Sequence, residues 1–105
     1  MEASNVRTIE PGRYIQFPNV PNYVEPSAES EFYHQHLALN FGSVSVAERE
    51  QNNAAAVHRS GKIISEFPLD SGNKLRFVTM IGFKTVAMIV NSRGEIVTDT
   101  PNRLS

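Results

Sequence analysis

The chain contains no cysteine among its 105 residues. This absence excludes disulfide scaffolds, thiolate zinc sites, iron–sulfur clusters and cysteine nucleophiles, and it fits a reducing compartment, so we expect a cytoplasmic protein. Long apolar runs are also missing, since none approaches the roughly 20 residues that a membrane-spanning helix needs. The first residues, MEASNVRTIE, lack the basic start and the apolar centre of a signal peptide. We therefore expect no membrane partner.

An excess of positive charge is missing as well. The formal net charge is −1, whereas non-specific binding to nucleic acid depends on a basic field, so a nucleic-acid partner is not expected. The charge is divided unevenly along the chain: residues 1–57 hold three arginines and seven glutamates, and residues 58–105 hold seven basic and four acidic groups. Such a division can place an acidic helical layer beside a basic sheet or steer two copies together, and it can also be incidental.

The length predicts one domain over residues 1–105, with 1–10 loosely ordered. The β-branched and aromatic content of 13–17, RYIQF, predicts a strand. Ser27 followed by acidic residues predicts a short helix over 28–36. The next stretch, 37–44, allows two interpretations: Leu37 and Phe41 continue a helical stripe, or they alternate as in a strand. We favour the strand.

A second helix is expected after Ser45. Ser45 and Glu48 match a capping box, in which each side chain bonds a free backbone N–H of the other residue. The helix then runs to about residue 59. Its apolar side is thin, and we expect Val46, Ala54 and Val57 to face the core and Asn52 to be exposed.

The region 62–100 is the predicted core of the fold. It reads as four short strands joined by tight turns, at 62–67, 74–81, 84–90 and 95–99. The fold class is thus α+β: an antiparallel sheet of about five or six strands, with a C-terminal four-strand meander and two short helices packed on one face.

The two middle strands of this meander are apolar on both sides. An antiparallel sheet with one wet face alternates apolar with polar residues, so both faces should be covered. Two thin helices can cover only one of them. We therefore expect a homo-oligomer, in the simplest case a dimer, or an unidentified protein partner, on a surface formed by Val78, Met80, Val86 and Met88 together with Tyr23 of the proline-rich loop, which alternatively pins that loop to the body.

Candidate chemistry is sparse. His34 and His36 are expected to be surface histidines, because His58 lies on another element and no third ligand completes a metal site. No catalytic constellation, metal site or cofactor is predicted. Basic residues could hold an anion at subunit junctions, and the candidates are Arg59, Lys62, Arg76 and Arg93.

These observations predict a small non-enzymatic binding or regulatory protein, for example an inhibitor, that acts through protein–protein contacts as a homo-oligomer. The first alternative is an oligomer that binds a nucleotide-like anion through the four basic residues just named. The second alternative is a histidine-dependent enzyme.

Overall fold

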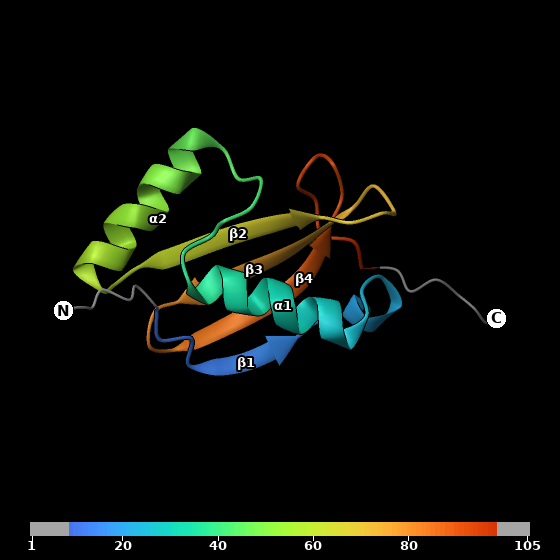
Figure 1. Ribbon diagram of the computed structural model, residues 1–105, viewed down its shortest axis with the longest axis horizontal. Coiled ribbons are helices and arrows are strands. Elements are labelled where there is room, and N and C mark those ends of the chain that lie inside the picture. Colours follow the sequence, from blue (N-terminus) through green and yellow to red (C-terminus); the bar gives the residue numbers. More distant parts are fainter. Residues whose placement is uncertain (1–8, 99–105) are drawn as a thin grey trace.

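The computed structural model describes residues 9–98 and shows an α+β fold with one four-stranded sheet (Figure 1). The sheet order is β1-β4-β3-β2. Within the described residues, no helix is long and apolar enough to cross a membrane. The elements in chain order are β1 (Arg13–Gln16), the 3-10 helix η1 (Val20–Asn22), α1 (Pro26–Leu37), α2 (Val46–His58), β2 (Lys62–Pro68), β3 (Lys74–Met80) and β4 (Lys84–Val90).

The sheet is mixed, which corrects the prediction of an all-antiparallel sheet of five or six strands. β2, β3 and β4 form the expected antiparallel meander, but β1 lies parallel to β4, with Tyr14 opposite Thr85. The strands predicted at 37–44 and 95–99 are represented only by isolated β-bridges, Gly42 with Glu66 and Ile96 with Val90. Asp99, the end of the last predicted strand, lies outside the described residues. Within residues 9–98 the meander therefore has three strands in place of four.

The strand predicted over 37–44 is wrong because α1 ends with a chain reversal. Leu39 adopts a left-handed φ of 67°. Its N–H donates to the carbonyl of His36 at 3.0 Å, and the N–H of Asn40 donates to that of Gln35 at 2.8 Å. This pair of hydrogen bonds is the Schellman motif, which satisfies the last carbonyls of a helix. Leu37, Leu39 and Phe41 therefore alternate in the sequence, but they do not lie on an extended strand.

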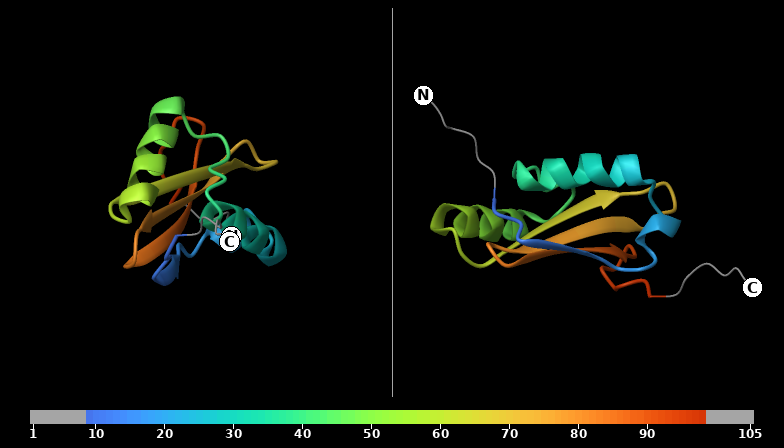
Figure 2. Two further views of the ribbon diagram at one scale, coloured as in Figure 1. Left: turned by 60° about the vertical axis from the view of Figure 1, so that its left-hand side comes forward. Right: turned by 90° about the horizontal axis from the view of Figure 1, so that it is seen from below.

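α1 lies across one face of the sheet (Figure 2). The Phe32 ring stacks on Phe67 with centroids 4.8 Å apart, and the Tyr33 ring lies 5.7 Å from that of Phe77. Together with η1, the helix covers a buried cluster whose members are Val20, Val24, Phe67, Leu75, Phe77, Ala87 and Ile89. This face of the sheet is therefore the main core.

α2 lies beside the edge strand β2, which corrects the expectation that both helices pack on one face (Figure 1). The capping box is present, because the Glu48 N–H donates to Ser45 Oγ at 3.1 Å and the Ser45 N–H to Glu48 Oε1 at 3.2 Å. Asn52 is 2% exposed and bonds both the N–H and the C=O of Ile64.

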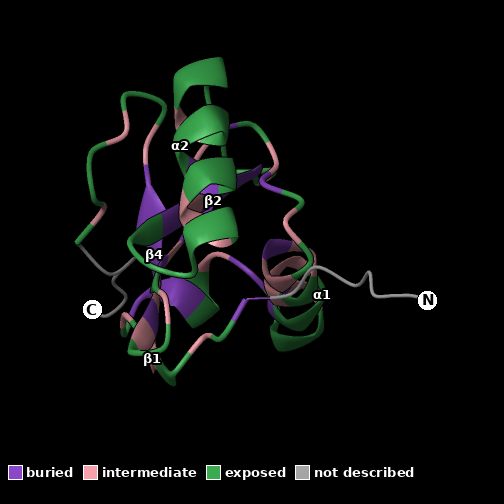
Figure 3. Ribbon diagram, turned by 90° about the vertical axis from the view of Figure 1, so that its left-hand side faces the viewer, coloured by how far each residue is buried: buried purple, intermediate pink, exposed green. Residues whose placement is uncertain are grey.

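The predicted apolar side of α2 is wrong. Val46 and Val57 are 72% and 71% exposed, and most of the helix surface faces solvent (Figure 3). A helix that covers a strand edge meets unpaired backbone groups, and these require a polar side chain rather than an apolar one. Asn52 supplies that side chain, which explains why it is buried where exposure was expected.

Candidate functional site

One face of the sheet points away from α1 (Figure 2). It is open around Val78 and Val86, whereas Ile64 at its β2 edge packs against a second buried cluster and Val90 at its other end is fully buried. We call it the open face. Side chains alternate along each strand, so its members follow from the buried position of Leu75, Phe77 and Thr79 on the other side. They are Arg13, Ile15, Lys62, Ile64, Glu66, Pro68, Lys74, Arg76, Val78, Met80, Lys84, Val86, Met88 and Val90.

An aliphatic row crosses all four strands of the open face. Ile64 is the register partner of Val78, Val78 of Val86, and Val86 of Ile15. All four side chains are only partly buried. Neighbouring strands lie about 4.8 Å apart, so the row is a continuous strip of β-branched side chains across the sheet. It includes two of the predicted interface residues, Val78 and Val86.

A cationic row runs next to the aliphatic row. Lys62, Met80, Lys84 and Arg13 are register partners, each two residues from the member of the aliphatic row on its strand. Met80 is 40% exposed. The ammonium of Lys84 lies 5.5 Å from the centroid of the Phe83 ring, which is itself 66% exposed. None of the ion pairs formed within 9–98 involves Arg13, Lys62 or Lys84.

An ion pair lies on the other side of the aliphatic row. Arg76 Nε donates to Glu66 Oε2 at 2.8 Å, and Lys74 Nζ lies 3.5 Å from Glu66 Oε1. Met88, the partner of Arg76 on β4, is 8% exposed. The open face thus carries five cationic side chains and one carboxylate, which makes it strongly basic on a chain whose net charge is −1.

The four predicted anion-binding residues do not form one cluster. Arg59 and Lys62 lie at the end of α2 and the start of β2. Arg76 is paired with Glu66, four residues further along β2 than Lys62, a separation of about 13 Å. Arg93 lies in the loop after β4, where its Nη2 is 3.4 Å from Glu95. Tyr23, another predicted contact residue, is partly buried against the core cluster on the α1 side.

His36 is fully buried, which corrects its prediction as a surface residue, while His34 is exposed. The Nδ1 atom of His36 lies 2.6 Å from Ser65 Oγ, and its Nε2 atom lies 2.6 Å from Thr79 Oγ1. Thr79 Oγ1 lies 2.7 Å from Thr85 Oγ1, which donates to the carbonyl of Pro11 at 2.9 Å. A chain of hydrogen bonds therefore crosses the core beneath α1.

The carbonyl of Pro11 fixes the direction of this chain. Since Thr85 donates to that carbonyl, Thr85 Oγ1 accepts from Thr79, and Thr79 Oγ1 accepts from His36 Nε2. With Nε2 as the donor, a neutral imidazole leaves Nδ1 as the acceptor for the Ser65 hydroxyl. Burial lowers the pKa of His36 to about 4, in agreement with this assignment. The network is closed to solvent and holds α1 onto the sheet.

The sequence contained a signal for this network. Ser65, Thr79 and Thr85 fall on the same side of their strands as buried apolar residues. Buried hydroxyls require partners, and a histidine on the covering helix can satisfy two of them at once.

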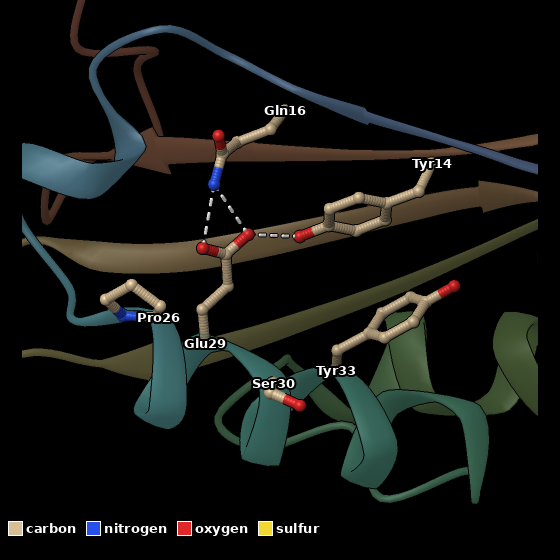
Figure 4. A pocket seen from close by; sticks show the side chains of 6 residues that line it. All are labelled: Tyr14, Gln16, Pro26, Glu29, Ser30 and Tyr33. Atoms are coloured by element: carbon tan, nitrogen blue, oxygen red, sulfur yellow. Dashed lines mark hydrogen bonds between the residues drawn. The ribbon is translucent and has the colours of Figure 1, made fainter.

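A pocket of about 420 Å³ lies between β1 and the first half of α1 (Figure 4). Sequence reasoning missed it. Its lining residues are Tyr14 and Gln16 from β1 and Pro26, Glu29, Ser30 and Tyr33 from α1. Glu29 is 7% exposed, and its carboxylate points to β1.

Hydrogen-bond donors surround the Glu29 carboxylate. Gln16 Nε2 lies 2.8 Å from Oε1 and 2.9 Å from Oε2, and the Tyr14 hydroxyl donates to Oε2. Burial raises the pKa of Tyr14 above its ordinary value, and its hydrogen bond to Glu29 raises it further, so this hydroxyl stays a donor. Burial also raises the pKa of Tyr33.

Comparisons with protein-family models, curated proteins and solved structures gave no match to this chain. Among the described residues, no group of three or more histidine, aspartate or glutamate side chains is placed to hold a metal ion.

Proposed function

We propose that this chain is a non-enzymatic binding protein and that the open face is its contact surface for an acidic segment of another protein. The observation that carries the proposal is the aliphatic row of Ile64, Val78, Val86 and Ile15 with the cationic row of Lys62, Lys84 and Arg13 beside it. Full burial of an exposed aliphatic side chain is worth about 1.5–3 kcal/mol, and these side chains are partly buried already, so a partner gains a fraction of that value at each position.

Charge selects the partner. Five cations and one carboxylate on the open face attract a negatively charged surface and suppress contact with a basic one. A second copy docked face to face would bring two such basic surfaces together. The self-association predicted from the sequence therefore stays a prediction, and the charge of the open face favours a different, acidic partner.

The side chains of the aliphatic row favour a protein over a nucleic acid. Proteins that bind single strands stack the bases on aromatic rings, whereas the row consists of isoleucine and valine. Phe83, in the turn between β3 and β4, is exposed, but the Lys84 ammonium already lies over its ring. The complete burial of His36 counts against the alternative of a histidine-dependent enzyme.

A peptide titration tests this proposal. The probe is an acidic helical peptide with a leucine stripe, and the reference is the same peptide with lysine in place of each glutamate. We expect the acidic peptide to bind at least about 10-fold more tightly at low salt, with a difference that shrinks as salt screens the charges. Equal affinity for the two peptides, or tighter binding of a single-stranded oligonucleotide, would overturn the proposal.

A matched pair of variants locates the contact. Lys62→Glu with Lys84→Glu reverses two charges in the cationic row, and Arg49→Glu with Arg93→Glu makes the same change in net charge elsewhere. Arg49 and Arg93 are both exposed. We expect the first pair to abolish the preference for the acidic peptide and the second pair to leave it. A stable dimer that Val86→Glu dissociates in sedimentation velocity would assign the open face to a second copy and contradict the proposal.

A further inference from the structure

The Glu29 carboxylate is a buried charge without a cationic partner among the described residues. None of the ion pairs within the described part of the chain includes it. Buried carboxylates in proteins are normally paired with a cation or a metal. The first turn of α1 contributes the partial positive charge of a helix N-terminus, equivalent to about half an elementary charge, so compensation is incomplete.

Two aromatic rings lie beside this carboxylate. The rings of Tyr14 and Tyr33 have centroids 4.8 Å apart and are tilted by 57°. Figure 4 shows the Tyr33 hydroxyl pointing away from Glu29, so this side chain offers its ring rather than its oxygen to the pocket. The faces of aromatic rings carry negative potential and attract cations.

We propose that this pocket, lined by Tyr14, Glu29 and Tyr33, binds a small organic ammonium group. The carboxylate supplies the opposite charge, and the two rings supply cation–π contact for the methyl or methylene groups around the nitrogen. Three hydrogen bonds reach the carboxylate, which can accept about four, so an N–H donor also finds an open acceptor.

Other ligand classes fit less well. An anion would meet the uncompensated charge of Glu29. A calcium or magnesium ion needs six or more oxygen ligands, and the pocket offers one carboxylate that is already hydrogen-bonded. The volume of about 420 Å³ lies in the range of small-molecule sites and admits a group the size of trimethylammonium.

The proposal is tested with two probes of the same shape. Choline and 3,3-dimethyl-1-butanol differ only in that a positive nitrogen replaces a neutral carbon. Amide shift mapping on isotope-labelled protein should show choline perturbing Tyr14, Glu29, Ser30 and Tyr33, and we expect it to bind at least about 10-fold more tightly than the alcohol. Equal binding of the two, or shifts confined to other residues, would overturn the proposal.

Two variants separate charge from shape. Glu29→Gln removes the charge and keeps the size, and Tyr33→Leu removes a ring and keeps an apolar side chain. Each should reduce choline affinity about 10-fold or more while the thermal unfolding transition stays cooperative. If Glu29→Gln disturbs folding, Tyr33→Leu still decides the matter, and unchanged choline affinity in that variant would contradict the assignment.

The ammonium group can belong to a free amine or to a modified protein side chain. A short peptide containing trimethyllysine, with an unmodified lysine peptide as its control, distinguishes these sources. Tighter binding of the trimethyllysine peptide than of choline identifies a protein side chain, and the reverse identifies a small free ammonium compound. Failure of choline and both peptides to bind at tens of millimolar would overturn the proposal, and it would leave the open face unaffected because that surface lies on the other side of the sheet.

Discussion

The Nε2 atom of His36 lies 2.6 Å from the Oγ1 atom of Thr79, 43 residues further along the chain. This hydrogen bond joins the covering helix α1 to the middle strand β3. Because both partners are fully buried, the bond exists only in the folded protein. The companion bond, in which Nδ1 of His36 accepts from Ser65 Oγ at 2.6 Å, requires a neutral imidazole. It therefore links the packing of α1 to pH.

Acid should destabilise the protein through His36. Burial lowers its pKa to about 4 in the folded state, whereas an unfolded histidine has a pKa near 6.5. The unfolded state thus binds the proton more readily. The stabilisation is complete above about pH 6.5 and is lost as the pH falls toward 4, by up to about 3 kcal/mol. Urea unfolding at a series of pH values measures this loss.

The exposed His34 on the same helix is the matched control. His34→Gln should leave the acid dependence of stability unchanged, whereas His36→Gln should flatten it between about pH 6.5 and 4. An imidazole resonance of His36 that titrates near 6.5 in the folded protein would contradict the buried neutral assignment.

Asn52→Ala should lower the free energy of unfolding. The side-chain amide donates to the carbonyl of Ile64 at 2.7 Å and accepts from its N–H at 2.9 Å. Alanine leaves both backbone groups at the edge of β2 without partners, which costs about 2–4 kcal/mol. The neighbouring Asn53 is exposed, so Asn53→Ala should change the free energy of unfolding by less than about 0.5 kcal/mol. Similar losses from the two substitutions would refute the edge-capping role of Asn52.

Arg59→Gly should stabilise the protein. Arg59 ends α2 with a left-handed φ of 58°, which strains any residue with a side chain. Glycine adopts this conformation freely, so we expect a gain of about 0.5–1 kcal/mol. His58→Gly is the control, because it places glycine at the last helical residue of α2 and should lose up to about 1 kcal/mol. The two midpoints of urea unfolding should move in opposite directions.

The two arginine ion pairs should differ in their contribution to stability. Arg76 and Glu66 have side chains that are 21% and 9% exposed, whereas those of Arg93 and Glu95 are 79% and 63% exposed. Arg76→Ala leaves a mostly buried carboxylate with only Lys74 nearby and should cost about 2–3 kcal/mol. Arg93→Ala should cost less than about 0.5 kcal/mol. Equal effects in thermal or urea unfolding would show that solvent screens both pairs alike.

Local sequence patterns predicted the elements whose signals are local. The turns around β2, β3 and β4 and the capping box of Ser45 and Glu48 follow from residues a few positions apart. The parallel placement of β1 beside β4 depends on where a long connection returns, which short-range patterns do not encode. Leu39 likewise reverses the chain without glycine, so its segment was mistaken for a strand.

The same limit applies to the sites. Alternation alone placed Val78 and Val86 on an exposed apolar face. Their row continues through Ile64 and Ile15 only because of the strand order, and the cationic row of Lys62, Lys84 and Arg13 appears for the same reason. Glu29 and Tyr14 come from different elements, and their contact requires the packing of α1 on β1.

The most direct test of the open face is a backbone amide shift map of isotope-labelled protein titrated with the acidic leucine-stripe peptide. We expect the largest perturbations along β3 and β4 around Val78 and Val86 and at Lys62 and Lys84, and we expect them to weaken as salt is raised. Perturbations centred on α1 or the exposed side of α2, with Val78 and Val86 unchanged, would contradict the open face as the contact surface of this protein.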